Sequence, residues 1–465
     1  MSDRRAMDTT TQNKSQATLA EWKAFLAENG PVEHLDAIFV DMCGKVRGKR
    51  LPGSDCEKVF TSGIQIPKSL YFLDVTGVNE DIYGMGVSDG DPDGQAWPLS
   101  GTIALTPWGD GQHAQVFMGM IDEKGAPFWI EPRNVLQGVL ERFAELGLRP
   151  VVAAEFEFYL TDPQRGEGGA PLAPLNPRNG RRETANEVYS IDGLDSYADL
   201  ISTITRYATI QNIPSSAATA EFAPGQFEIN LNHEDDVLKA GDHAVMLRHL
   251  IRAAAREHDY RASFMAKPFV DQTGSGCHMH VSILDEEGRN IFDDGGELGA
   301  DALRHAIGGL QQTMAASMAL VAPNVNAFRR FEANNFVPVN GQWGYNNRSV
   351  AFRVPTGSPE ARRVEHRVAG ADVNPYLLFA TVLAGIHHGL SKKIDPGAPY
   401  ANNASETPDP RLPRNVPTSL EALRASDVMR DYLGSRYVDV YTRVKEFEFE
   451  KLYETISSKE YQWYL

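Results

Sequence analysis

Pairs of polar residues separated by one apolar residue recur along this chain. Glu155 and Glu157 lie in "VVAAEFEFYL", and His278 and His280 lie in "SGCHMHVSIL". Ser282 continues the second segment at the same spacing. A third segment contains Glu228, Asn230 and Asn232, and a fourth contains Arg363, Glu365 and Arg367. Side chains at i and i+2 of a β-strand point to one face. Carboxylates with an imidazole suit Mg²⁺ or Mn²⁺, and two such ions near arginines are typical of phosphoryl transfer.

A strand with one solvated face would show the same alternation, and for any single segment that explanation is the simpler one. Taken together, however, the four segments place carboxylates, imidazoles and guanidinium groups on one predicted surface. Clustered carboxylates raise one another's pKa unless cations hold them. We therefore expect the four segments to be neighbouring strands that together bind cations.

The elements that must position these residues indicate an α+β fold. Residues 19–30 predict a helix and residues 34–52 a hairpin. Residues 74–94 contain no Lys or Arg and predict a long acidic loop. We expect a disordered tail over 1–16, an N-terminal domain over 17–122 and a catalytic domain over 123–465. Helices are predicted at 192–211, 239–259 and 301–320, with strands between them rather than a regular βαβ order.

Composition narrows the class of protein. The formal net charge of −17 over 465 residues disfavours nucleic acid as a partner. The three cysteines have no CxxC spacing, which predicts neither a disulfide framework nor a zinc site and favours a reducing, cytoplasmic compartment. No apolar run reaches the ~18 residues that a membrane span needs, and "YLLFATVLAGIHHGL" predicts a buried helix.

Seven segments closely resemble the glutamine synthetase family, in matching order and spacing. They are "AAEFEFY", "AEFAPGQFEI", "FMAKPFVDQTGSGCHMHVS", "NAFRRF", "NRSVAFRVP", "ARRVEHR" and "NPYLLFATVLAGI". The resemblance implies a small β-grasp-like N-terminal domain and a catalytic domain whose curved antiparallel sheet forms a funnel inside outer helices. It also implies a dodecamer of two hexameric rings, in which a neighbour's N-terminal domain completes each active site.

The resemblance also implies roles for individual residues. One metal ion would be held by Glu157, Glu221 and Glu228, and the other by Glu155, His278 and Glu365. The positions matched to ATP binding are His280, Ser282, Arg348, Arg353 and Arg363. Gly274, Arg330 and Arg367 match glutamate-binding positions, and Arg348 and Arg353 match the arginines on the transferring phosphate. Arg348, Arg353 and Arg330 are the implied catalytic residues. The implied reaction uses ATP to convert L-glutamate to γ-glutamyl phosphate, which an amine then attacks.

Two carboxylates that bind ammonium in ammonia-using members are not clearly present. The "DGSS" motif is missing, and Asp74 in "LDVTG" is its nearest counterpart. Counted from Arg330 without a gap, the position of the flap glutamate falls on Phe336, with Glu332 out of register. The segment "NNFVPVNGQWGYNNRSV" resembles the γ-glutamylpolyamine synthetase branch. Phe336 and Asp74 are therefore predicted to line an amine pocket, for putrescine, another polyamine or a monoamine.

The acidic loop offers further partners for the distal ammonium of a polyamine, although a solvated acidic turn explains it equally well. The acidic residues concerned are Asp74, Glu80, Asp81, Asp89 and Asp91. Two other functions stay open. One is an ammonia-using glutamine synthetase with a rearranged base. The other is a non-catalytic scaffold, which would be expected to lose metal ligands, whereas all six positions are filled here.

Overall fold

The computed structural model describes residues 15–296, 298–333 and 336–465. Most of the predicted tail, residues 1–14, lies outside this range. Gln16 already forms a β-bridge with Leu99, and Ala17 is buried, so ordered structure begins before the predicted end of the tail at residue 16. The predicted division after residue 122 falls between strand β6 and helix α3, and it stays a prediction.

The first part of the chain forms a mixed sheet with the strand order β2-β1-β6-β4-β3, and β5 also pairs with β6. The strands are β1 (His34–Val40), β2 (Val46–Pro52), β3 (Ile64–Pro67), β4 (Asp93–Pro98), β5 (Ala104–Thr106) and β6 (His113–Ile121). β1 and β6 are parallel, and the other pairs are antiparallel. Helices α1 (Leu19–Asn29) and α2 (Cys56–Ser62) meet where Trp22 stacks on Phe60, with ring centroids 5.0 Å apart.

The second sheet has the order β12-β13-β14-β11-β7-β9-β8, and β10 also pairs with β7. Its strands are β7 (Arg149–Thr161), β8 (Ser215–Ala220), β9 (Gln226–Leu231), β10 (Arg261–Ser263), β11 (Cys277–Leu284), β12 (Trp343–Tyr345), β13 (Phe352–Val354) and β14 (Val364–His366). Every pair is antiparallel except β12 with β13. The four strands expected from polar spacing are consecutive neighbours, in the order β14-β11-β7-β9, which confirms the predicted adjacency; their binding of cations stays a prediction.

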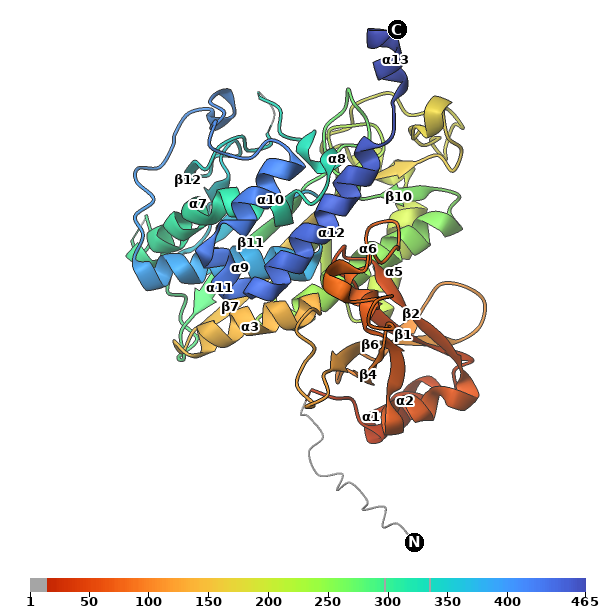
Figure 1. Cartoon of the computed structure of the whole chain (residues 1–465). Coiled ribbons are helices and arrows are strands. Elements are labelled where there is room, and N and C mark those ends of the chain that lie inside the picture. Colours follow the sequence, from red (N-terminus) through yellow and green to blue (C-terminus); the bar gives the residue numbers. More distant parts are fainter. Residues whose placement is uncertain (1–14, 297, 334–335) are drawn as a thin grey trace.

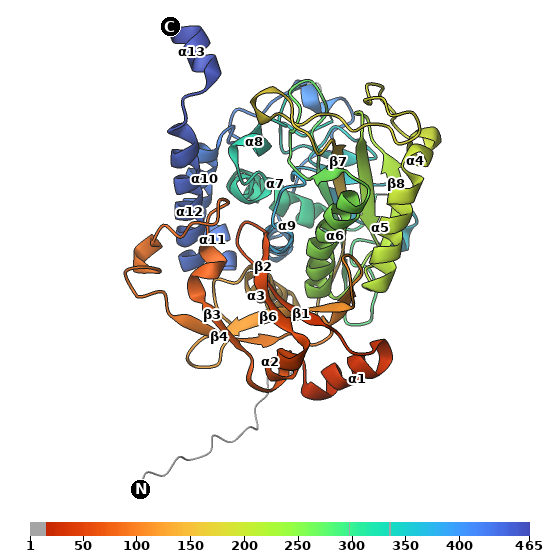
Figure 2. The ribbon, with the colours of Figure 1, turned by 90° about the vertical axis from the view of Figure 1, so that its right-hand side faces the viewer.

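Helices surround the second sheet (Figures 1 and 2). The helices of this part of the chain are α3 (Pro132–Ala144), α4 (Ile191–Ser196), α5 (Ala198–Ile210), α6 (Val237–Glu257), α7 (Asp301–Val321), α8 (Val325–Phe328), α9 (Pro375–Lys392), α10 (Val416–Arg424), α11 (Asp427–Leu433), α12 (Ser435–Tyr453) and α13 (Ser458–Tyr464). The buried helix predicted from "YLLFATVLAGIHHGL" is α9, whose first turn is capped by Asn374. A Cβ on Gly309 of α7 would lie 2.1 Å from the Gly385 carbonyl of α9, so glycine permits this close packing.

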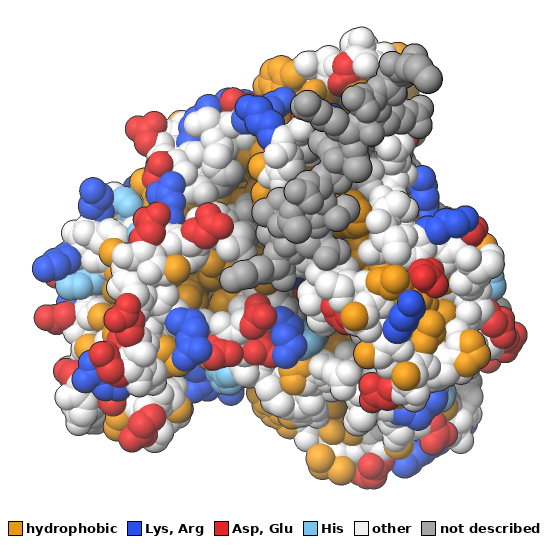
Figure 3. Space-filling view, turned by 90° about the horizontal axis from the view of Figure 1, so that it is seen from below, with side chains coloured by type: hydrophobic (Ala, Val, Ile, Leu, Met, Phe, Trp, Pro, Cys, Tyr) orange, Lys and Arg blue, Asp and Glu red, His pale blue; other side chains and the backbone are white. Residues whose placement is uncertain are grey.

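Helix α13 stands away from the body of the molecule, whereas α12 lies along it (Figures 1 and 2). None of the helices in the described residues is long and apolar enough to cross a membrane. Acidic and basic side chains lie side by side over the face seen in Figure 3. This mixture differs from the continuous basic surface that nucleic-acid binding requires.

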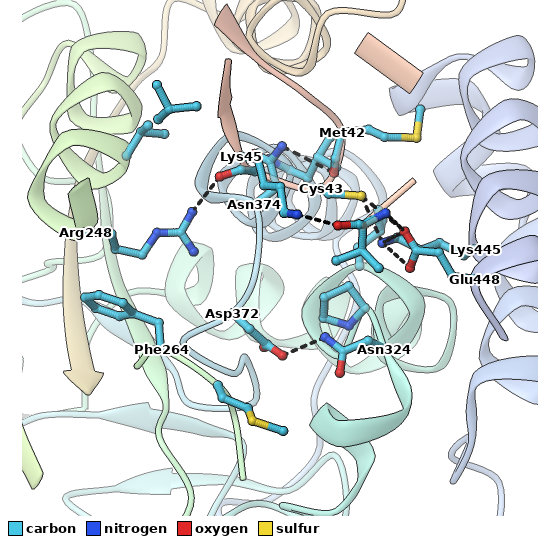
Figure 4. Close-up of a pocket in the computed structure, with 18 of the residues that line it drawn as sticks. Met42, Cys43, Lys45, Arg248, Phe264, Asn324, Asp372, Asn374, Lys445 and Glu448 are labelled. Atoms are coloured by element: carbon cyan, nitrogen blue, oxygen red, sulfur yellow. Dashed lines mark hydrogen bonds and ion pairs between the residues drawn. The ribbon is translucent and has the colours of Figure 1, made fainter. Parts of the chain in front are cut away.

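Arg248 of α6 joins the two parts of the molecule behind β7 (Figure 4). Its guanidinium donates to the carbonyls of Ala371 and Val373, at 3.1 and 2.7 Å, and to that of Gly44 in the β1–β2 turn, at 3.3 Å. A cavity of about 530 Å³ lies here, between the turn, α6 and α12. Phe264 lines it and packs edge-on against Phe156 of β7. The cavity is therefore behind the strand and not at the carboxylates.

Candidate active site

Strand β7 carries two kinds of side chain on its two faces. Phe156 and Phe158 are buried on one face, while Glu155 and Glu157 are partly accessible on the other. Strand register supplies their neighbours, because Glu155 is paired with His278 of β11 and Glu157 with Glu228 of β9. The hydrogen-bonded backbone of the sheet thus brings together side chains that are far apart in the sequence.

One group of possible ligands consists of Glu155, His278 and Glu365, each of which offers an atom within 4.8 Å of the others. His278 Nδ1 lies 3.3 Å from Glu155 Oε2 and 3.9 Å from Glu365 Oε1. His280 Nε2 donates to Glu155 Oε1 at 2.9 Å, while its Nδ1 accepts from Arg363 Nε at 3.2 Å. His280 therefore orients a ligand, and Arg363 orients His280.

The second group consists of Glu157, Glu228 and the same histidine, His278. His278 Nε2 lies 3.8 Å from Glu157 Oε1, and Glu157 Oε2 accepts from the Gly276 backbone N–H at 2.8 Å. Glu221, which follows β8, belongs to neither group of three among the described residues. It is nevertheless close enough to feel the charges of Glu157 and Glu228. These groups contain the same residues as the two predicted ligand sets, except that His278 replaces Glu221 in the second.

Electrostatics differ across the cluster. Burial raises the pKa of Glu221 to about 8, helped by repulsion from Glu157 and Glu228. Burial likewise raises the pKa of Glu228 to about 8, with repulsion from Glu155 and Glu157. For Glu155, burial acts in the same direction, but hydrogen bonds from His278 and His280 outweigh it and hold the pKa well below its usual range. At Glu221 and Glu228, burial and repulsion between carboxylates thus outweigh the positive charge nearby.

Glu365 is the best-compensated carboxylate of the cluster. It is almost completely buried, which opposes its ionisation, but Arg367, the two histidines and Arg353 lower its pKa to about 2. Arg353 Nη1 donates to Glu365 Oε2 at 2.9 Å, and Arg367 Nη1 forms an ion pair with Oε1. The structure therefore places Arg367, predicted to bind glutamate, and Arg353, predicted to bind ATP, against a single metal-ligand candidate.

The other predicted substrate residues lie around this centre. Arg330 is buried, donates to the Val368 carbonyl at 3.0 Å, and keeps an Nε without a hydrogen-bond partner among the described residues. A Cβ on Gly274 would lie 2.4 Å from Arg330 Cγ, so glycine is needed there for the close approach. Ser282 is half-buried at the far end of β11, and Arg348 is exposed in the loop between β12 and β13. The substrate roles of all these residues stay predictions.

The sequence reasoning missed Gln226, which fixes the loop before β11. Its Nε2 donates to the Gly274 carbonyl at 3.1 Å, and its Oε1 accepts from the Thr273 hydroxyl at 2.6 Å. Gln226 lies two residues before Glu228 on β9, so the same alternation rule, extended by one step, would have found it.

The two residues predicted to line the amine pocket, Phe336 and Asp74, differ from each other in exposure to solvent. The Phe336 side chain is 74% exposed. Asp74 is buried, and its carboxylate is already used by the Thr76 N–H and hydroxyl, by the Val78 N–H, and by Lys451 Nζ at 2.9 Å. Although burial opposes ionisation, these donors hold the Asp74 pKa well below its usual range.

Four other carboxylates of the acidic loop are also engaged within the chain. Glu80 forms an ion pair with the same Lys451, and Asp81 accepts from the Ser88 hydroxyl. Asp89 accepts from the Gly86 N–H at 2.9 Å, and Asp91 accepts from the Ser69 hydroxyl at 3.0 Å. These contacts support the reading of the loop as a folded acidic turn, and an amine would have to displace them.

The donor set fits divalent cations with a preference for oxygen. Carboxylates dominate both groups of ligands, with His278 as the shared nitrogen donor. Glu221 and Glu228, whose pKa values are raised to about 8, would ionise when a cation binds beside them. The residues present therefore fit a two-ion centre on chemical grounds.

Comparisons with known proteins agree with this picture. Residues 130–464 match the family described as "Glutamine synthetase, catalytic domain". The chain is 38% identical over 454 residues to the gamma-glutamylputrescine synthetase PuuA of Escherichia coli, an alignment covering 98% of this chain and 96% of that protein. It is 31% identical over 436 residues to the glutamate–isopropylamine ligase of a Pseudomonas species, covering 92% and 93%. The ligand-free structure of GmaS superposes with a TM-score of 0.81 at 27% identity, covering 95% and 98%.

Proposed function

Because the chain belongs to the glutamine synthetase family, we propose that it is an ATP-dependent ligase that joins the γ-carboxylate of L-glutamate to an amine. The observation that carries the proposal is the pair of acidic ligand groups that share His278, with Arg353 and Arg367 beside them. Two relatives named for putrescine and isopropylamine support an alkylamine rather than ammonia as the acceptor.

We assign two Mg²⁺ or Mn²⁺ ions to the cluster. Glu155, His278 and Glu365 would hold the ion on the nucleotide side, and Glu157, Glu221 and Glu228 would hold the ion on the glutamate side. The chemistry supplied by these ions is neutralisation of phosphate charge and polarisation of the transferred phosphoryl group.

The arginines of the chain perform the rest of the positioning. Arg330 lies against Gly274, and we propose that its guanidinium group binds a carboxylate of the substrate. Arg348, Arg353 and Arg363, with His280 and Ser282, would hold ATP so that its γ-phosphate meets the glutamate side chain. The product of that transfer is γ-glutamyl phosphate, a far better acyl donor than a carboxylate.

The amine attacks only as a neutral nucleophile, and a primary alkylamine has a pKa near ~10, so the site must take a proton from it. Phe336 replaces an anionic cap with an apolar ring, which favours an alkyl chain over ammonium. The ion pairs of Lys451 with Asp74 and Glu80 support a role in amine binding, because a lysine side chain ends in an alkylammonium group. We propose that the distal end of a polyamine competes for the same carboxylates.

We further propose a cytoplasmic enzyme that forms a dodecamer of two hexameric rings. The three cysteines are unpaired in the structure, which suits a reducing compartment. In this assembly, the N-terminal domain of a neighbour would complete each site, as the family resemblance implies.

A phosphate-release assay with ATP, glutamate and a panel of amines tests the proposal. We expect putrescine, another polyamine or a monoamine to give a higher kcat/KM than ammonia, and no release without glutamate. Glu365→Ala removes a ligand that touches His278 and two arginines, so it should abolish release, while Glu57→Gln on the distant helix α2 serves as the control. Equal use of ammonia would favour the alternative of a glutamine synthetase. Failure of every acceptor would favour a scaffold.

A further inference from the structure

Two histidines and a glutamate meet at one end of the N-terminal sheet, apart from the acidic cluster. His34 opens β1 and His113 opens the parallel strand β6, where the two residues are paired in register. Their Nδ1 atoms lie 3.3 Å apart, and Glu33 offers a carboxylate oxygen within 4.8 Å of a nitrogen on each ring. We propose that Glu33, His34 and His113 bind a transition-metal ion of the Zn²⁺ class.

The tautomer of His113 is fixed by the backbone. Its Nε2 lies 2.6 Å from the carbonyl oxygen of Asp110, and a carbonyl can only accept a hydrogen bond. Nε2 must therefore carry the proton, which leaves a lone pair on Nδ1, pointing towards His34. A metal-bound imidazole commonly donates its other ring N–H to a carbonyl in this way, which orients the ring and strengthens the ligand.

The spacing of the two nitrogens fits one ion between them. Zn–N bonds are about 2.0–2.1 Å, so two ligands of a tetrahedral ion lie about 3.3–3.4 Å apart. The observed separation of His34 Nδ1 and His113 Nδ1 is 3.3 Å. A direct N–H···N hydrogen bond would give the same distance, but it would not involve the carboxylate of Glu33.

The backbone around Glu33 holds that carboxylate near the rings. The Glu33 N–H donates to the Gln112 carbonyl at 2.8 Å, and the Glu33 carbonyl accepts from the Gly53 N–H at 2.7 Å. Gly111 has φ +87°, and a Cβ there would lie 2.8 Å from both carboxylate oxygens of Glu33. Glycine at this position therefore gives the carboxylate room beside the turn that also presents the Asp110 carbonyl.

The ligand set indicates which ions the site takes. Two imidazoles and one carboxylate favour Zn²⁺, Ni²⁺ or Cu²⁺ over Mg²⁺, in contrast to the oxygen-rich acidic cluster. Three protein ligands leave a fourth position for water. A bound ion would tie residues 33–34 to residue 113 and so fasten the start of β1 to the start of β6. The cysteine pattern, which predicted no zinc site, could not reveal a site built from histidines.

Co²⁺ titration of the full-length protein tests the site, with Co²⁺ as a coloured substitute for Zn²⁺. The protein carries no histidine tag, is freed of metal with a chelator, and is kept in saturating Mg²⁺ and ADP to occupy the acidic cluster. We expect one equivalent of Co²⁺ to give the intense visible absorption of a four-coordinate ion, and one equivalent of Zn²⁺ to remove it. His113→Gln should abolish the band, and Glu33→Gln should weaken Co²⁺ binding by more than about tenfold.

His388→Gln is the matched control, because His388 lies on α9, hydrogen-bonded to Gln312, and outside the site. It should keep the band unchanged. Glu33 is exposed, so its variant tests the site even if a histidine variant folds poorly. The proposal is overturned if no band forms, if Glu33→Gln and His113→Gln leave it unchanged, or if raising Mg²⁺ removes it, since the ion would then belong to the acidic cluster.

Discussion

Metal binding at the acidic cluster is expected to tighten as the pH rises, because two of its carboxylates must lose protons first. Glu221 and Glu228 both have pKa values raised to about 8. A group with that pKa is about nine-tenths protonated at pH 7. Because the proton must leave before the ion binds, the apparent affinity for the ion is weakened by about 11-fold, or ~1.4 kcal/mol. At pH 8 the factor is about 2. Affinity should therefore rise about fivefold from pH 7 to 8 if one group controls it, and about 30-fold if both do.

Isothermal titration calorimetry with Mn²⁺, in buffers of different ionisation enthalpy, measures both the affinity and the protons released. Two groups with a pKa near 8 release up to about 1.8 protons at pH 7 and about 0.2 at pH 9. In Glu228→Gln one titrating group is gone and its charge no longer raises the pKa of Glu221, so the pH dependence should fall below fivefold. Glu57→Gln should behave as the wild type. An affinity that is the same at pH 7 and pH 8, with almost no proton release, would refute this electrostatic account.

Three further outcomes are expected. Phe336→Glu should raise the ratio of kcat/KM for ammonia to that for an alkylamine by about tenfold, and an unchanged ratio would place Phe336 outside the amine path. Burial raises the pKa of Glu131 to about 7 in the folded protein, against about 4.5 in the unfolded chain. The fold therefore holds the Glu131 proton more tightly, and this stabilises the folded state fully below pH 4.5. That stabilisation is lost as the pH rises to 7. Glu131→Gln should therefore gain up to ~3 kcal/mol on the wild type between pH 4.5 and 7 in urea unfolding, whereas parallel curves would contradict the assignment. Lys451→Gln frees Asp74 Oδ2 and Glu80, so KM for a diamine should fall while KM for a monoamine stays constant. Equal changes in the two KM values would mean that these carboxylates do not contact the amine.

The central strands of the second sheet could be predicted because their polar side chains recur at every second residue. Glu155 and Glu157 could be assigned to one face before any neighbour was known, and the cross-strand partners His278 and Glu228 follow the same rule. Glu221 lies outside a strand, after β8, and only family resemblance pointed to it.

Contacts between distant segments could not be predicted in this way. His34 and His113 are paired across the parallel strands β1 and β6. No pattern within either segment indicates that the other histidine is its partner. The ion pairs of Lys451 with Asp74 and Glu80 join α12 to the acidic loop across almost the whole length of the chain. Local periodicity carries no information about such pairs, because tertiary packing alone brings them together.

The different side chains on the two faces of β7 also favour one register of this strand in the sheet during folding. A shift by one residue would turn Glu155 and Glu157 into the aromatic core and expose Phe156 and Phe158 instead. Two buried carboxylates without partners would be strongly unfavourable, and so would the loss of two buried rings. Misaligned forms of the sheet are thus disfavoured by the same residues that line the candidate active site, before any ion or substrate arrives.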